Sequence, residues 1–115
     1  MSTLNYSIED RENVKIVHLS GAISSITRVD FEIMMEDLLA KGNVILNLSR
    51  VGLVTVTGLT TLVDLSTSAR KKGKRVLIMG MRPELMKMAD RLDIYDHFSF
   101  VETIEEGQLK LRYYT

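Results

Sequence analysis

The residues best suited to chemistry in this sequence are few and scattered. The only histidines are His18 and His97. His18 lies inside an apolar run, where a histidine is more often packed or hydrogen-bonded than used as a base. His97 follows Asp93 and Asp96, but a zinc site needs three or four protein ligands and no second histidine or cysteine is nearby. We therefore predict a solvated turn at His97 and no metal ligands.

Motifs for nucleophilic catalysis and phosphate binding are also missing. The sequence has no cysteine, which excludes a thiol nucleophile, a thiolate metal site and a disulfide framework. It contains neither Gly-x-Ser-x-Gly nor Gly-x-Gly-x-x-Gly. Gly52 and Gly58 flank a turn, but Leu59 stands where a phosphate loop needs its lysine. We predict no catalytic residue, no cofactor and no enzymatic activity.

Length and composition narrow the class of protein. The 115 residues are the usual size of one domain, so residues 1–115 are predicted to form a single domain. Fifteen basic and fifteen acidic residues give a net charge of zero, without the basic excess typical of a nucleic-acid binder. No apolar run approaches the roughly 18 residues of a membrane span, and the N-terminus is polar rather than signal-like. We expect a soluble, cytoplasmic protein.

The hydrophobic pattern predicts several strands. Apolar and polar residues alternate over 4–8, as in a half-exposed strand, and the polar stretch 10–13 is typical of a hairpin loop. The apolar segment 14–19 predicts a second, more buried strand. Consecutive apolar residues at 44–46, within a strand expected over 44–48, and at 76–79 indicate central strands that are covered on both faces.

Helical spacing predicts the remaining elements. Residues 29–41 carry apolar side chains at i, i+3, i+4, i+7 and i+8, and further helices are expected over 58–72, 83–92 and 103–108. Phe98, Phe100 and Val101 (98–101) suggest a last short strand. In the helix expected over 29–41, the apolar stripe consists of Phe31, Met34, Met35, Leu38 and Leu39.

Residues at the helix ends support these boundaries. Gly42 and Gly73 stand where left-handed C-caps are expected. Pro83 suits the first turn of a helix. Thr103 and Glu106 have the spacing of a capping box.

The order of elements defines the fold class. Strands alternate with helices after an initial strand pair, so the central strands should be parallel and connected by helical crossovers. The first strand should pair antiparallel through the hairpin at one edge. We predict an α/β fold with a mixed sheet, a mainly parallel core, an antiparallel edge hairpin and about four helices packed on it.

The most specific segment is a strand-to-helix turn at 55–59. In the simplest interpretation Thr57 is the helix N-cap and accepts a hydrogen bond from a backbone N–H. A phosphoryl group on Thr57 would be tolerated there, because the free N–H groups and the helix dipole favour anions. It would then act mainly on a docked partner, through about two negative charges placed in an otherwise neutral interface.

At this turn the chain resembles the STAS domain of bacterial anti-sigma factor antagonists. The family's turn reads Asp-Ser-Ser-Gly-Leu, and its second serine is the phosphorylation site. The resemblance runs from about Asp10 to Glu106, and the ungapped order of elements carries it. The aligned turn residues are Thr55, Val56, Thr57, Gly58 and Leu59. The resemblance implies an α/β STAS domain with Thr57 as the phosphorylation acceptor.

The chain also departs from the family pattern. Thr55 replaces the turn aspartate, Val56 replaces the first serine, and Ser24 stands where the family has an acidic residue after the second strand. A kinase that recognises those carboxylates would find fewer of them here. Thr57 keeps the hydroxyl that phosphorylation needs.

The resemblance implies a protein-interaction switch in transcription regulation. Such a domain binds an anti-sigma factor that is also a serine/threonine kinase, which releases the sigma factor, and phosphorylation at the turn breaks the complex. The residues implied in docking are Ser24, Thr55, Val56, Thr57, Gly58 and Leu59. Any ATP would belong to the kinase partner.

Two other functions are compatible with the sequence. The domain could be a scaffold or adaptor subunit of a signalling or transporter-associated complex that is never phosphorylated, which suits the loss of acidic residues at Ser24 and Thr55. A small enzyme or nucleotide-binding protein is disfavoured by the missing phosphate loop and acid/base pair. The sequence does not define the oligomeric state, although the first strand could be an exposed edge.

Overall fold

The computed structural model describes residues 3–113. A four-stranded sheet has the order β1-β2-β3-β4, formed by Leu4–Arg11, Val14–Ile23, Asn43–Val54 and Val76–Met79. β1 pairs antiparallel with β2, and the other two pairings are parallel. This is the predicted mixed sheet with an antiparallel hairpin at one edge.

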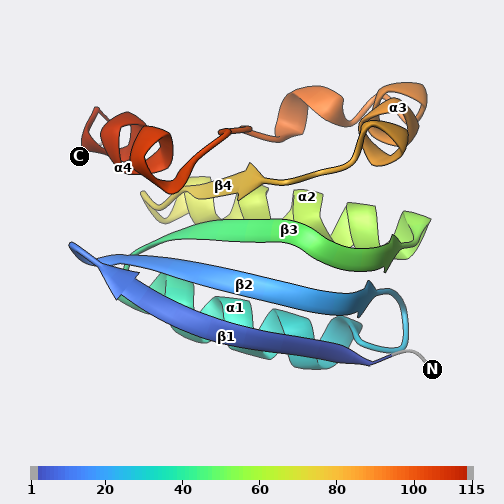
Figure 1. The fold of residues 1–115 in the computed structure, drawn as a ribbon, viewed down its shortest axis with the longest axis horizontal. Helices are drawn as coiled ribbons and strands as arrows, with labels where there is room; N and C mark the ends of the chain where they lie inside the picture. The colour runs from blue at the N-terminus through green and yellow to red at the C-terminus, as the bar shows by residue number, and fades with distance from the viewer. Residues whose placement is uncertain (1–2, 114–115) are drawn as a thin grey trace.

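Four α-helices accompany the sheet. α1 (Arg28–Lys41) and α2 (Val56–Lys71) lie side by side on one face (Figure 1). α3 (Pro83–Arg91) and the short 3₁₀ helix Tyr95–His97 lie beyond the β4 edge. α4 (Ile104–Arg112) packs on the other face, near the hairpin end. The central strands are therefore sandwiched over part of their length only.

The core has two unequal parts. The larger part fills the space between the sheet and α1/α2, and all five residues of the predicted α1 stripe are buried in it. The smaller part lies under α4, where Ile16, Ile45 and Leu77 from three neighbouring strands meet Leu111. On β2 and β3, successive side chains alternate between these two parts, as the pleat of a strand requires.

Several boundaries differ from the sequence prediction. The hairpin turn is only Glu12 and Asn13, both with positive φ (53° and 70°), as in a two-residue type I′ turn. β3 extends to Val54, well beyond residue 48, and two bulges against β2 accommodate its extra residues. α2 begins at Val56 and α4 extends to Arg112.

The predicted strand at 98–101 is wrong. The segment makes only one bridge, in which Ile78 donates to Ser99 O (2.9 Å) and accepts from Val101 N (2.9 Å). β4 ends at Met79, and Gly80 turns the chain away with φ 77°. Phe98 and Val101 are buried, so the apolar pattern at 98–101 reflects core packing together with this single bridge to β4, which is too short to form a strand.

The two glycines predicted as left-handed caps have different roles. Gly73 has φ +76° after α2, as predicted. Gly42 has φ 171°, which is extended backbone, so its prediction as a left-handed cap is wrong. A Cβ at Gly42 would lie 2.8 Å from the carbonyl oxygen of Asn13. The glycine at 42 therefore permits close approach to the hairpin turn.

Candidate functional site

The candidate site lies at the end of the sheet where β2 and β3 terminate. These parallel neighbours end side by side, with Ile23 paired to Val54. The N–H of Thr55 donates to the carbonyl of Ile23 (3.1 Å), which joins the start of the β3–α2 turn to the end of β2. The loop 24–27 and the turn 55–59 are therefore brought together by strand pairing (Figure 1).

Thr55, and not Thr57, is the N-cap of α2. Its backbone is extended (φ −81°, ψ 172°), and its hydroxyl oxygen accepts from the N–H of Gly58 at 3.1 Å. The prediction of Thr57 as the cap is therefore wrong. β3 and α2 follow each other with one intervening residue, so the cap lies two positions earlier than the hydrophobic pattern indicated.

Thr57 is an exposed residue in the first turn of α2. Its carbonyl accepts hydrogen bonds from the hydroxyls of Thr60 (3.0 Å) and Thr61 (2.8 Å). Its own hydroxyl has no partner among residues 3–113. The first turn of α2 contains no acidic residue, so no carboxylate offsets the positive end of the helix dipole.

Gly58 and Leu59 hold the helix start against the sheet. A Cβ at Gly58 would lie 2.2 Å from the carbonyl oxygen of Ile23, closer than any side chain permits. Leu59 is fully buried in the larger core. Gly58 and Leu59 therefore position the preceding residues. The exposed surface of the turn is formed by Val56 and Thr57.

Ser24 organises the β2–α1 loop from within. It is only 5% exposed; its N–H donates to the Thr27 hydroxyl oxygen (3.0 Å), and its own hydroxyl accepts from the N–H of Ile26 (3.3 Å). Thr27 in turn donates to the carbonyl of Ala22 (2.9 Å). These hydrogen bonds make Ser24 a positioning residue for the loop. Its side chain itself exposes little surface to a partner.

Three large apolar side chains lie next to the turn, and two of them, Ile26 and Leu53, were not singled out from the sequence. Leu53 is 51% exposed, Val56 52% and Ile26 74%. The stretches 20–27 and 51–63, which build this end of the sheet, contain no charged residue. The lack of charged residues in these two stretches is the sequence feature that could have pointed to Ile26 and Leu53. Only the pairing of the ends of β2 and β3 shows that the two stretches belong to one surface.

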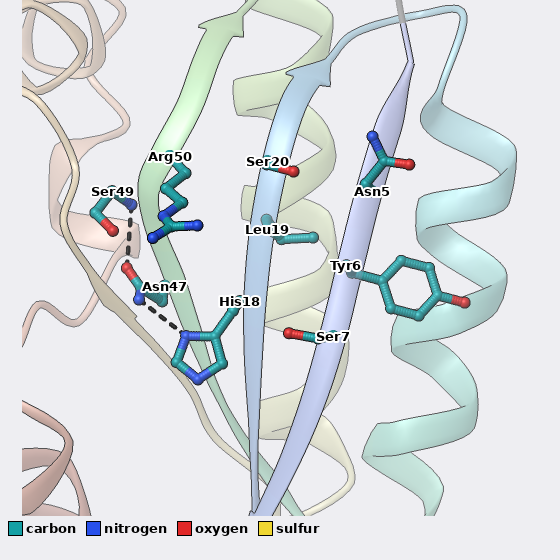
Figure 2. A pocket seen from close by; sticks show the side chains of 9 residues that line it. All are labelled: Asn5, Tyr6, Ser7, His18, Leu19, Ser20, Asn47, Ser49 and Arg50. Carbon is teal, nitrogen blue, oxygen red and sulfur yellow. Dashed lines mark hydrogen bonds between the residues drawn. The ribbon is translucent and has the colours of Figure 1, made fainter.

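A polar groove of about 560 Å³ lies on the sheet face that α1 and α2 leave uncovered (Figure 2). Within it, Asn47 accepts from the N–H of Ser49 (3.1 Å), which aims the Asn47 amide NH₂ at Nδ1 of His18 (3.0 Å). Nε2 of His18 then donates to Glu9 (3.1 Å). The groove is lined by Asn5, Tyr6, Ser7, His18, Leu19, Ser20, Asn47, Ser49 and Arg50.

Both ring nitrogens of His18 are thus occupied, which confirms the prediction of a hydrogen-bonded histidine. The hydrogen bond from His18, and after it the one from Arg11, holds the pKa of Glu9 below its usual value of 4.5. The network leaves no ring nitrogen free to take a proton from a molecule in the groove. Its arrangement is that of a structural network.

The remaining chemical candidates do not form a site within residues 3–113. His97 is exposed in the short helix Tyr95–His97, as predicted for a solvated turn. No group of three or more His, Cys, Asp or Glu side chains in this range could hold a metal ion. Over the same range, no helix is long and apolar enough to cross a membrane.

Comparison with known proteins decides the family. The sequence profile of the STAS domain matches residues 5–107, nearly the whole chain. The chain belongs to the STAS domain family. Thr57 and Gly58 therefore lie at the strand-to-helix turn of a STAS domain. No curated protein sequence gives a significant match.

Solved structures share this fold at low sequence identity. An anti-sigma factor antagonist from Mycobacterium paratuberculosis has a TM-score of 0.77 and 18% identity, over 97% of this chain and 99% of that one. The phosphorylated form of the Bacillus cell fate determinant SpoIIAA has a TM-score of 0.69 and 13% identity, over 94% and 100%. The murine anion transporter Slc26a9 has a TM-score of 0.71 and 15% identity, over 98% of this chain but 22% of the transporter. This fold thus makes up nearly the whole of the first two chains and 22% of the transporter.

Proposed function

We propose that this STAS domain is a regulatory binding protein that works as an anti-sigma factor antagonist. Its partner is an anti-sigma factor with serine/threonine kinase activity, which docks on the sheet end formed by Ile26, Leu53, Val56 and Thr57. Docking releases the sigma factor, and phosphorylation of Thr57 ends the complex. Two anti-sigma factor antagonists share the fold, the mycobacterial protein and SpoIIAA, and they support this class of function.

The observation that carries the proposal is that Thr55 caps α2 while Thr57 remains exposed. Thr55 already caps α2, so the hydroxyl of Thr57 has no structural task and faces solvent. It sits beside apolar side chains that a partner could bury, and burial of about 25 cal/mol per Å² favours such docking. Residues Ser24, Gly58 and Leu59 support this surface from below.

Phosphorylation would act on the complex and not on the fold. A phosphate on Thr57 brings about two negative charges to a surface that has none, and the α2 N-terminus tolerates them. A partner seated on the apolar side chains would have to desolvate those charges, which is costly. The switch is therefore expected to raise the dissociation rate while leaving the domain folded.

A binding experiment with three variants tests the proposal. The tagged chain, Thr57→Ala and Thr57→Glu are used to capture partners from the native cells, with mass spectrometry of the bound proteins and of the peptide that contains Thr57. We expect a kinase-type anti-sigma factor bound to the native chain and to Thr57→Ala, lost with Thr57→Glu, and phosphate on Thr57 in the unbound native fraction. Ser68→Glu is the matched control, because it adds the same charge to an exposed position at the far end of α2.

The scaffold function is the second candidate. It is favoured by the absence of charge at Ser24 and Thr55 and by the presence of this fold inside a transporter. A partner without kinase character that binds the native chain and Thr57→Glu equally, with Thr57 never modified, would establish it and contradict the switch.

A further inference from the structure

We propose that this chain forms a symmetric homodimer by antiparallel pairing of β1 with β1 of a second copy, with Ser7 on the twofold axis. The inference concerns a different part of the molecule from the proposed docking surface. β1 is the edge strand of the sheet, and β2 separates it from β3. The proposed dimer does not depend on the function of Thr57.

The outer edge of β1 is long and regular. The strand has eight residues, no proline, and an unbroken register with β2. No described strand pairs with its other side. Proteins usually protect such edges by shortening, bulges, proline or charge. Here charges occupy only the hairpin end, at Glu9, Asp10 and Arg11.

The hydrogen bonds show which residues of β1 face outward. At one end, Thr3 O accepts from the N–H of Ala22 (2.8 Å), so the backbone of Thr3 faces β2. At the other end, the two-residue type I′ turn makes Arg11 and Val14 the closing hydrogen-bonded pair. Hydrogen-bonded pairs alternate along an antiparallel ladder. The outward N–H and C=O groups therefore belong to Leu4, Tyr6, Ile8 and Asp10.

This alternation restricts how two copies can pair. A twofold axis perpendicular to the sheet keeps the two faces of the sheet continuous, so residues of the same parity stand opposite each other. The register centred on Ser7 places Leu4 opposite Asp10 and Tyr6 opposite Ile8, each pair twice. It uses all four outward residues and forms roughly eight backbone hydrogen bonds. Registers centred on Tyr6 or Ile8 use three of them and form about six.

The side chains suit the same register. Tyr6 and Ile8 are 51% and 45% exposed on the helix-bearing face, and the dimer would bury them against each other as aromatic–aliphatic pairs. On the groove face, the amide of Asn5 would meet the carboxylate of Glu9 from the second copy. No like charges stand opposite each other in this register.

The first test is the mass of the full chain in solution. Sedimentation equilibrium over a concentration series should give a mass that rises from 13.1 kDa to twice that value. Ile8→Pro should remain at 13.1 kDa, because it removes an outward N–H that β2 does not use. Tyr6→Lys, which leaves the β1 backbone intact, should weaken the dimer at least tenfold. Thr57→Glu should dimerise like the native chain.

Cysteine cross-linking tests the register. The chain has no cysteine, so one introduced residue reports on one position. Ser7→Cys would face its copy as a non-hydrogen-bonded pair with Cα atoms about 4.5 Å apart, within the range of a disulfide. It should form a disulfide dimer on mild oxidation, whereas Tyr6→Cys and Ile8→Cys should not. A chain that stays monomeric at every concentration, or a dimer that Ile8→Pro and Tyr6→Lys leave intact, overturns the proposal; faster cross-linking at residue 6 or 8 overturns the register.

Discussion

The two ends of the sheet differ sharply in charge. At the hairpin end, ion pairs join Lys15 to Asp10, Arg11 to Glu105 of α4 (3.4 Å), and Arg112 of α4 to Glu12 (3.4 Å). At the opposite end, the stretches 20–27 and 51–63 carry no charge and expose large apolar side chains. The same strands thus run from an end with several ion pairs to an end formed by stretches without charged residues.

This difference indicates where a protein partner can dock. Exposed ion pairs contribute little to stability, typically about 0–1 kcal/mol each, but they keep a surface hydrated. A surface of threonine, serine and aliphatic residues loses little hydration when it is covered. The uncharged end is therefore the better docking surface, and a phosphate there changes the local charge more than it would at the hairpin end.

The largest change in the free energy of unfolding is expected from Gly58→Ala at the uncharged end. The new Cβ would lie 2.2 Å from the carbonyl oxygen of Ile23, and backbone on both sides must move to admit it. We expect a loss of about 3 kcal/mol in the free energy of unfolding, measured by urea titration. Gly52→Ala is the matched control, because its Cβ has only Gly21 O nearby, at 3.9 Å. Equal stability of the two variants would contradict the close packing of α2 on β2.

A smaller loss is expected from Thr55→Ala. The variant removes the hydroxyl that accepts from the N–H of Gly58, and loss of an N-cap costs about 1 kcal/mol. Thr57→Ala should change the free energy of unfolding by less than about 0.5 kcal/mol, because its hydroxyl has no partner. Thermal unfolding of the two variants measures the difference. The reverse order would return the capping role to Thr57.

A third prediction concerns charge at the start of α2. Thr57→Glu places a carboxylate in a first turn that lacks one, where the helix dipole favours it. The free energy of unfolding should rise by about 0.5 kcal/mol at low salt, and the gain should shrink as salt is added. Ser68→Glu, near the basic last turn of the same helix, separates dipole effects from general charge effects. A destabilised Thr57→Glu would mean that the phosphorylated domain is not simply the folded domain with a new charge.

The smallest effect is expected at the hairpin end, from Glu9→Gln. Hydrogen bonds from His18 and Arg11 lower the pKa of Glu9 below 4.5, so the unfolded chain takes up this proton before the folded one. The stabilisation is present at neutral pH and is lost as the pH falls below 4.5 toward the folded-state pKa. Unfolding measured across this range should show a steeper loss of stability in the native chain than in Glu9→Gln. Parallel curves would show that the network contributes nothing.

The sequence predicted the elements better than their ends. The stripe at Phe31–Leu39 was confirmed residue by residue, because a 3.6-residue period depends only on which face of one helix meets the core. The end of β3 and the start of α2 were misplaced. Val51 and Val54 are buried by pairing with β2, and their exposed neighbours obscure the strand pattern.

The candidate site was also predicted in part only. The turn itself, with its threonine, glycine and leucine, was located from the sequence by family resemblance. The contribution of Ile26 and Leu53 could not be predicted, since they belong to segments that only the β2–β3 pairing brings together. The burial of Ser24 also depends on the Thr27 hydroxyl and the Ala22 carbonyl, a contact that forms only once the loop is closed.

By itself the sequence determined the α/β class and the order of the strands and helices, apart from the segment 98–101. These follow from local periodicity and residue type. The tertiary structure decided that Thr55 caps α2, that Thr57 is left exposed, and that the free edge of β1 presents four outward residues. Those facts depend on hydrogen bonds between segments distant in the chain, and no local pattern encodes which backbone group finds which partner.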